Sequence, residues 1–448
     1  MKYSFHTLLK IIIAIVIQLI VSPVFVSAQT VRTLSISDAI DIALNKSRML
    51  SIGKEKIKAA EAKQDEVKAS RLPTLKFQTG YTRLSDVPPF IVSLPFPGTT
   101  PFTIAPVILD NYVMKLSAAQ PLFTGFKLDN LEESAGFAAS ATKSEYDKDK
   151  LELIAMIKMQ YWGLVKARQF SLVAKENVEI LKVHLKDVQT MQKAGMAQLS
   201  DILKVQVQLT EAEYRLIEAN NQVQLGMMAL NNALRLPLET QLETTDTPKD
   251  SPLPMPADEM VKTAFATRPD IKAAEFRVKA GETQVRVAES SWYPQVSAFA
   301  EYNYNNPNMR IVPARSQFDN TWAAGIQMTM DLWNWGLNSA QTRQAEAQLA
   351  QALDAGALTK EAIQIEVMQA YTLMKQAAEK IPVSEASIQQ AEEQVRLVNA
   401  KFASGNAIMT DILDAETSLL LAKMNRVQAI IDLEIAKVKV EKSIGITF

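Results

Sequence analysis

The sequence predicts an α+β membrane protein made of two tandem repeats, each with one β-hairpin and a pair of long antiparallel helices. Three observations favour this fold. The 448-residue chain repeats its own pattern, it contains proline-free stretches much longer than ordinary helices, and it has four segments in which apolar and polar residues alternate. The first observation sets the domain boundaries, the second gives the helices, and the third places part of the chain in a membrane.

Residues 1–28 have the pattern of a secretory signal peptide. Lys2 and Lys10 precede the apolar stretch 11–21, and residues 26–28 offer a small-residue cleavage site. The apolar stretch is too short for a membrane anchor, since about 20 residues are needed to span a bilayer. The segment therefore predicts export of the chain from the cytosol.

Two copies of one pattern fill the rest of the chain, at residues 29–236 and 258–448. A shift of 210 residues places Tyr161 on Tyr371 and Gly195 on Gly405, whereas the earlier part of the repeat aligns with a shift of 221. The first copy therefore carries a longer insert. The residues between the copies, 237–257, contain five prolines and are interpreted as an extended linker.

Each copy predicts a helix, two strands, a very long helix, a turn and a last helix. No proline occurs from Leu122 to Leu236, so the long helix ends only near Gly195; Pro382 predicts a kink in the long helix of the second copy. Helices of this length are stable only when an apolar stripe is buried against neighbours. The expected helices are at about residues 36–70, 125–193 and 200–235, then 258–291, 336–403 and 410–444.

The alternating segments predict strands with one face in lipid and the other in water, at about residues 74–83, 111–121, 294–304 and 321–333. The alternative is a soluble hairpin that packs on the helices. The long helices and the export signal favour the membrane. Unpaired backbone groups in hydrocarbon each cost several kcal/mol, and the smallest single-chain barrels have about eight strands. Four strands must therefore be completed by other subunits, and this count alone permits a dimer, a trimer or a tetramer.

Composition excludes several classes of protein. The 48 Lys and Arg balance 49 Asp and Glu, so no basic excess predicts nucleic-acid binding. The chain has no Cys, which removes disulfides, thiolate metal sites and cysteine nucleophiles, and only His184 lies beyond the first few residues. No phosphate-binding loop or nucleophile elbow is found. We therefore expect no cofactor, no metal and no enzymatic activity, and we expect His184 to lie on a helix surface.

The two turns have related sequences. Residues 194–203 read Ala-Gly-Met-Ala-Gln-Leu-Ser-Asp-Ile-Leu, and residues 402–415 contain Gly405 and the run Thr-Asp-Ile-Leu-Asp-Ala at the same place in the second copy. With the twofold repeat and the order of elements, these turns resemble the TolC-like outer-membrane efflux proteins. The resemblance covers nearly all of the chain after the signal peptide.

This resemblance implies a homotrimer with a shared twelve-stranded β-barrel in the lipid of a Gram-negative outer membrane and a helical tunnel in the periplasm. It also implies a passive exit duct of a tripartite efflux or type I secretion system. The turns would form the inner tip of the tunnel, where a periplasmic adaptor (membrane fusion) protein docks and an inner-membrane transporter supplies the energy. The competing interpretation is a periplasmic coiled-coil scaffold or adhesin stalk that spans no membrane.

The resemblance also implies the candidate site residues. Asp411 and Asp414 match positions where the family places acidic residues toward the pore, so that threefold symmetry would make carboxylate rings that favour cations. A purely structural role is open for some of them, because Ser and Thr are natural N-caps and an Asp at a helix start is stabilised by the helix dipole. The positions expected to form the adaptor-docking tips are Gly195, Ser200, Asp201, Gly405 and Thr410.

Overall fold

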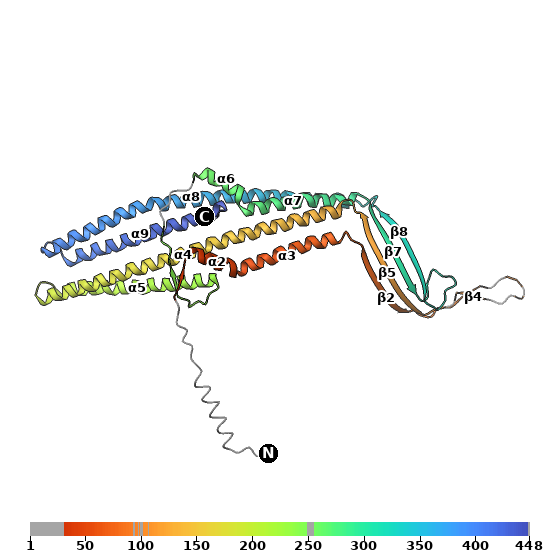
Figure 1. The fold of residues 1–448 in the computed structure, drawn as a ribbon, viewed down its shortest axis with the longest axis horizontal. Coiled ribbons are helices and arrows are strands. Elements are labelled where there is room, and N and C mark those ends of the chain that lie inside the picture. Colours follow the sequence, from red (N-terminus) through yellow and green to blue (C-terminus); the bar gives the residue numbers. More distant parts are fainter. Residues whose placement is uncertain are drawn as a thin grey trace, which may run out of the picture. The chain divides into compact units, whose positions relative to one another are not determined.

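The computed structural model describes residues 31–446 except 93–94, 97, 99–101, 106 and 249–254, so the expected signal peptide lies outside the described residues. The chain forms two compact units (Figure 1). One contains both helical turns and consists of Met1–Ser47, Met156–Ser251 and Gln376–Ile435; we call it the turn unit. The other contains the large sheet and consists of Arg48–Ala155, Pro252–Lys375 and Ala436–Phe448; we call it the sheet unit.

The long helices of the two repeats have the same lengths and a constant offset. The helices α4 (Lys127–Lys193) and α8 (Leu337–Ala403) each have 67 residues, and α5 (Leu199–Leu234) and α9 (Met409–Ile444) each have 36. All four bounds differ by the 210 residues that the sequence repeat requires. The helix α8 is uninterrupted at Pro382, so the proline does not break it; the kink there stays a prediction.

The first helix of each repeat is divided, which corrects the expected helices at 36–70 and 258–291. In the first repeat α2 (Ile36–Lys46) and α3 (Arg48–Ala69) are separated by Ser47, which has an extended backbone with ψ 121°. In the second repeat α6 (Ala257–Thr267) and α7 (Pro269–Glu289) are separated by Arg268, with ψ 128°. The proline at 269 explains the second break, because a residue before proline is disfavoured in helical conformation. A 3₁₀ turn, Ser290–Trp292, follows α7.

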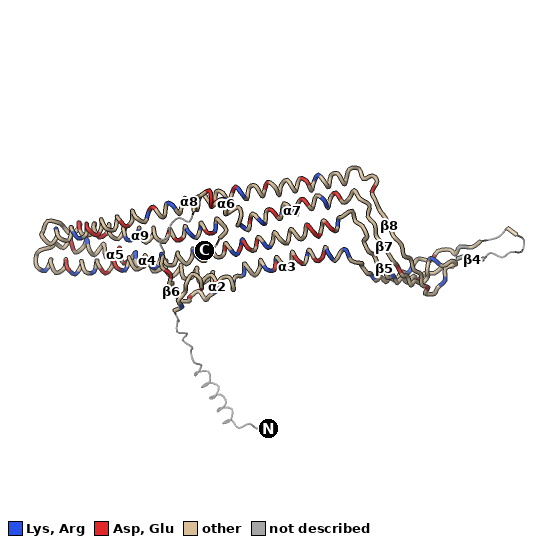
Figure 2. Tube along the Cα trace, turned by 45° about the horizontal axis from the view of Figure 1, so that its top comes forward, with Lys and Arg blue, Asp and Glu red and all other residues tan. Residues whose placement is uncertain are grey.

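The four predicted strands form one antiparallel sheet in the order β2 (Thr74–Arg83), β5 (Asp110–Phe123), β7 (Gln295–Asn305) and β8 (Asp319–Thr329). Its register aligns apolar residues across all strands on one face, as in the row Phe77, Leu116, Tyr302 and Trp322. The strands are mostly uncharged (Figure 2). On the opposite face Lys115 and Glu301 form an ion pair of 2.6 Å. Exposed apolar residues on the first face are Leu75, Phe77, Tyr81, Met114, Leu116, Tyr302, Trp322, Ile326 and Met328.

The strand expected at 321–333 ends earlier, at Thr329. Its partner strand begins at Gln295, which pairs with Thr329 and directly follows Pro294. Proline has no N–H group to donate, so residues beyond Thr329 find no continuing ladder. The long insert of the first repeat contains a short hairpin of β3 (Phe90–Val92) and β4 (Phe102–Ala105), which the alternation did not predict.

In the turn unit, Tyr161 of α4 fastens two chain segments that are distant in sequence. The strand β1 (Arg32–Leu34) pairs in parallel with β6 (Leu242–Thr244) of the inter-repeat segment. The fully buried Tyr161 hydroxyl lies 2.9 Å from the Leu34 carbonyl and 2.8 Å from an Asp246 carboxylate oxygen, and it accepts the N–H groups of Thr245 and Asp246 at 3.0 and 3.1 Å. Burial raises the pKa of Tyr161. The expected extended linker is therefore anchored at residues 242–246.

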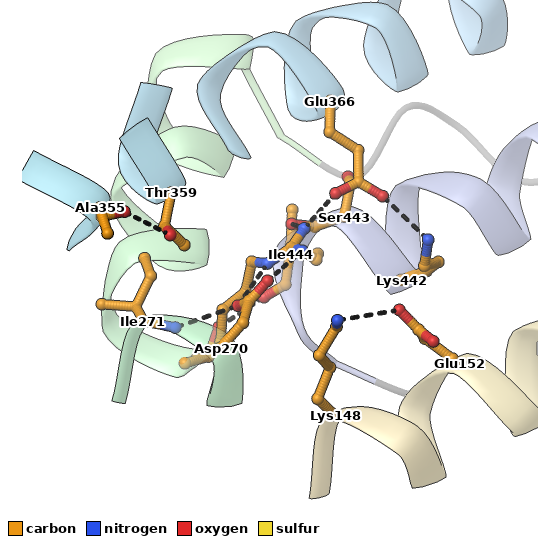
Figure 3. A network of polar contacts seen from close by, with 12 residues as sticks. Lys148, Glu152, Asp270, Ile271, Ala355, Thr359, Glu366, Lys442, Ser443 and Ile444 are labelled. Carbon is orange, nitrogen blue, oxygen red and sulfur yellow. Dashed lines mark hydrogen bonds and ion pairs between the residues drawn. The ribbon is translucent and has the colours of Figure 1, made fainter. Parts of the chain in front are cut away.

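In the sheet unit, Arg268 lies at the break between α6 and α7 and joins three helices, whose residues Asp270, Glu366 and Ser443 are labelled in Figure 3. Its guanidinium donates to both Asp270 oxygens at 3.0 and 2.7 Å, to Glu366 of α8 at 2.7 Å, and to the Ser443 carbonyl of α9 at 2.9 Å. Lys442 also pairs with Glu366 at 3.1 Å. Because the Arg268 side chain is only 7% exposed, these bonds compensate a buried charge.

Candidate functional site at the helical turns

The two turns lie at the same end of the turn unit and have the same backbone geometry (Figure 1). Gly195 and Gly405 have φ of 76° and 78°, the left-handed region in which glycine carries no side-chain penalty. Each helix end is closed by an N–H that reaches back five residues, from Met196 to Met191 and from Asn406 to Lys401, both at 2.8 Å. Gly195 and Gly405 are thus the helix C-cap residues that the sequence predicted.

The helix starts after the turns differ from the expected caps. Ser200 and Thr410 were expected as N-caps, but each is the second residue of its helix. The third residue makes the capping contact instead. The N–H of Gln198 donates to Asp201 at 3.1 Å, and the N–H of Ile408 donates to Asp411 at 2.9 Å. Both carboxylates therefore satisfy a free backbone donor at a helix N-terminus, where the dipole also stabilises negative charge.

Asp414 lies one helical turn beyond Asp411 and has different surroundings. Its side chain is exposed, and among the described residues it has no hydrogen bond or ion pair. The residue at the same place in the first repeat is Lys204, whose ammonium donates to the Thr410 hydroxyl at 3.3 Å and lies 3.8 Å from Asp201. The structure thus brings Asp201, Lys204 and Thr410 together and leaves Asp414 apart. Sequence reasoning missed this cross-link between the turns.

An apolar cluster next to the turns holds the two helix pairs together. Its buried residues come from α4, α5 and α9, and α8 adds partly buried residues. Such continuous burial fixes the positions of the exposed turn residues above it. Its buried members are Val178, Leu181, Val188, Val205, Ala212, Met409, Ile412 and Leu413, and Val398 and Phe402 of α8 pack against it.

Farther from the turns, polar contacts join α4 to α9. Lys166 pairs with Asp432 at 3.0 Å, and Glu176 pairs with Lys423 at 2.7 Å. His184 lies 3.5 Å from Glu416, and both side chains are largely buried. His184 is therefore not the helix-surface residue that we expected, because its side chain is largely buried and lies against Glu416 of α9. Along all the helices, acidic and basic residues are interspersed (Figure 2).

Within residues 31–446, apart from the gaps named above, no group of three or more His, Asp or Glu side chains is arranged to hold a metal ion. In the same part of the chain, no helix combines the length and apolarity that a transmembrane helix needs.

Comparison with known proteins identifies the family. A family model described as outer membrane efflux protein matches residues 39–234 and 260–446, the two repeats in turn. The chain belongs to this family. The outer membrane efflux protein BepC of Brucella suis is 20% identical over 320 residues, which are 71% of this chain and 68% of BepC. The alkaline protease secretion protein AprF of Pseudomonas aeruginosa is 22% identical over 317 residues, 70% of this chain and 65% of AprF.

The solved structure of the outer membrane protein VceC of Vibrio cholerae has the same fold. It matches with a TM-score of 0.77 at 19% identity and covers 92% of this chain and 96% of VceC. The fold prediction of two repeats with long helices and an antiparallel sheet is thus confirmed. The chain is an outer-membrane efflux protein of a Gram-negative bacterium, as the resemblance implied. The protein extends from the outer membrane into the periplasm. The scaffold or adhesin interpretation is set aside.

Proposed function

We propose that three copies of this chain form a passive duct through the outer membrane. The observation that supports this most strongly is the four-stranded sheet, in which β2 and β8 each have one paired and one open edge. One face of the sheet is apolar from edge to edge. Open edges in hydrocarbon leave backbone groups unpaired at several kcal/mol each, so β8 of one subunit pairs with β2 of the next. Three such sheets make a closed barrel of twelve strands.

The duct has no chemical step of its own. The subunits surround a passage in which substrates move from periplasm to exterior, and energy comes from an inner-membrane transporter. The printed names of the relatives include an efflux protein and a protease secretion protein. Both names fit a duct that a periplasmic adaptor protein joins to the inner-membrane transporter, in a tripartite efflux assembly or in a type I secretion assembly.

The adaptor docks on the turns. Apolar side chains are unusually exposed there, with Met196 at 73% and Ile408 at 64%, next to the glycine caps. Exposed apolar groups that lie near one another are typical of an interaction site. The docking residues are thus Gly195, Ser200, Asp201, Gly405 and Thr410 together with these two side chains.

Asp414 supplies the charge at the inner mouth. Its free carboxylate becomes a ring of three in the trimer, which favours cations over anions. Asp411 carries the same charge nearby, but its carboxylate also accepts the Ile408 N–H. Asp411 therefore has two roles, since it adds negative charge at the inner mouth and caps its helix. Asp414 has only the first of these roles.

The proposal is tested on the full chain, expressed in a Gram-negative host that lacks its own duct. We expect a trimer in outer-membrane extracts that withstands mild SDS, dissociates on heating and opens a conducting pore in planar bilayers. Bulky residues at Gly195 and Gly405 should abolish efflux. Each substitution costs about 1–2 kcal/mol because φ is positive there, but its side chain meets no atom within 4 Å, so the trimer should still form. A protein that stays monomeric in detergent, or in buffer without it, would refute the duct; normal efflux in the glycine variant would refute docking at the turns.

A further inference from the structure

One contact in the turn unit joins the two helix pairs through side chains that can change charge. His184 of α4 and Glu416 of α9 have side chains only 16% and 10% exposed, and the His184 Nε2 atom lies 3.5 Å from a Glu416 carboxylate oxygen. Yet Nε2 is buried and makes no hydrogen bond with the described residues. Buried polar atoms are normally hydrogen-bonded, so this one needs a physical explanation.

The missing bond depends on one proton. A neutral imidazole has one ring nitrogen that donates and one that only accepts, whereas both nitrogens donate when the ring is protonated. The carboxylate of Glu416 accepts but cannot donate. Protonation of His184 therefore provides a donor at Nε2 for Glu416. The bond that results joins two opposite charges, and such bonds are roughly twice as strong as neutral ones.

Glu416 has no second partner that could replace His184. Among the described residues its carboxylate makes no other ion pair or hydrogen bond, and an unpaired carboxylate is costly to bury. The other charged side chains on the nearby turns of the four helices are paired with each other or exposed to water. The pairs are Glu176 with Lys423, Glu179 with Lys182, Asp201 with Lys204, Glu211 with Arg215 and Glu393 with Arg396, and the exposed groups are Lys186, Asp187, Glu213, Glu392, Lys401, Asp411 and Asp414.

The pair lies on the faces of α4 and α9 that meet. His184 is one helical turn from Leu181 and Val188, and Glu416 is one turn from Leu413; these three apolar residues belong to the cluster next to the turns. Water is largely excluded from the pair, so a bond between the two charges is little screened. The hydrogen bonding of this pair therefore acts directly on the contact between α4 and α9.

We propose that His184 is a pH-sensitive clamp between the two helix pairs of the chain. With the ring protonated, Nε2 donates to Glu416 and holds α4 against α9. With the ring neutral the clamp is released, because the buried carboxylate then faces no charge that balances its own. Histidine commonly changes charge between about pH 5 and 8. The clamp therefore tightens as the pH falls through this range and loosens as the pH rises.

The clamp regulates the proposed duct, and this part of the inference rests on the proposed function. The helix pairs surround the passage at the turns, so the passage widens there only when the helix pairs shift relative to one another. A bond that holds α4 against α9 opposes such a shift. Acid therefore favours the narrow state of the inner mouth.

The chain itself offers the chemistry of an uncharged reference. At the positions equivalent to His184 and Glu416, 210 residues away, it has Gln394 and Gln206. A glutamine amide both donates and accepts hydrogen bonds and carries no charge at any pH in this range. Glutamine is therefore the substitution that removes the titration of His184 or Glu416 while it keeps a polar side chain in place.

Hydrogen–deuterium exchange of the full protein in detergent tests the clamp. Beyond residue 6, His184 is the only histidine, so no other imidazole contributes. The parent and His184→Gln are compared with each other at about pH 5.5 and again at about pH 8, so that the chemical dependence of exchange on pH cancels. In peptides covering residues 180–188 and 412–420, the exchange rate of the parent relative to the variant should be about tenfold lower at the acid pH, as expected for one buried charge-assisted bond.

Glu416→Gln should remove the same pH dependence, and the double variant should behave like either single variant, since the two groups act as a pair. Each single variant is compared with the parent on its own, so the test stands if one of them fails to assemble. Asp187→Asn is the matched control, because it removes an exposed charge one turn from His184 and should leave the pH dependence as in the parent. An exchange ratio that is the same at both pH values, or a pH dependence that persists in Glu416→Gln, overturns the inference.

Conductance in planar bilayers tests the effect of the clamp on the duct. At about pH 5.5 the His184→Gln pore should conduct more than the parent pore, and at about pH 8 the two should conduct equally. Equal conductance at both pH values would show that the clamp does not narrow the passage. If the unaltered chain opens no pore at either pH, the proposed function is refuted, and the exchange experiment still decides whether the clamp exists.

Discussion

Replacing Tyr161 by phenylalanine should loosen the anchored part of the inter-repeat segment while leaving the helices intact. The substitution removes one oxygen and keeps the ring, which is fully buried against Trp162. The lost hydroxyl is the acceptor for the N–H groups of Thr245 and Asp246 and lies beside the Leu34 carbonyl. The change therefore affects hydrogen bonding and leaves packing nearly unaltered.

The magnitude follows from the two stranded donors. A donor that loses its partner costs about 1–3 kcal/mol, and the lower end applies because Thr245 is exposed and Asp246 half-buried. The local opening free energy should then fall by about 2 kcal/mol, which corresponds to roughly 30-fold more frequent opening. Hydrogen–deuterium exchange of the full protein in detergent, read by mass spectrometry on peptides covering residues 242–246, measures this increase.

The second repeat provides the control. Tyr371 occupies the equivalent position, is half-buried, and has no hydrogen bond to its hydroxyl among the described residues. Tyr371→Phe should therefore leave exchange unchanged everywhere. Unaltered exchange at 242–246 in Tyr161→Phe, or an equal effect of both substitutions, would show that the hydroxyl does not hold the segment.

Three further outcomes are expected. Asp414→Ala should lower the cation selectivity of the pore in planar bilayers, and identical reversal potentials would remove it from the inner mouth. Gly125→Ala should lower the heat resistance of the trimer more than Gly336→Ala: both glycines have positive φ, which costs other residues about 1–2 kcal/mol, but only at Gly125 would a Cβ lie 2.6 Å from a backbone oxygen. Arg268→Gln should remove stability that depends on pH. Burial acts to raise the pKa of Asp270, but the hydrogen bonds and charge of Arg268 outweigh it and lower that pKa below 3.8. Because the pKa of Asp270 is lower in the folded state, its carboxylate stabilises the fold at pH values above 3.8, and this contribution is lost as the pH falls through the folded-state pKa. The heat resistance of the variant and of the parent should therefore converge in acid. A constant difference across that range would exclude the mechanism.

The sequence was a good guide wherever one local rule decided the structure. The proline-free stretch of the first repeat and the 210-residue shift located the long helices to within a few residues, because helix continuation depends on each residue and its near neighbours. Alternation located the strands for the same reason. The end of β8 at Thr329 was missed, since it depends on Pro294, which directly precedes the partner strand β7.

Contacts between distant segments carried no such local signal. The pairing of β5 with β7 joins the two repeats, and the pairing of β1 with β6 joins the first strand to the inter-repeat segment. Both depend on backbone groups that any residue type provides. At the turns, sequence located the glycines but assigned the caps to Ser200 and Thr410, because it could not tell which residue begins each helix. The capping role of Asp411 and the exposure of Asp414 became distinguishable only with that start known.

The pairings made within the chain leave the sheet incomplete. Charged pairs join α4 to α9, and β5 pairs with β7, so these contacts between the repeats form as the single chain folds. The strands β2 and β8, in contrast, each keep one open edge beside an apolar face. Unpaired backbone groups in hydrocarbon cost several kcal/mol each, so pairing of these edges with a neighbouring subunit in the proposed trimer would contribute far more than any single contact within the chain. We therefore expect the membrane-inserted sheet to be stable only after the subunits have joined.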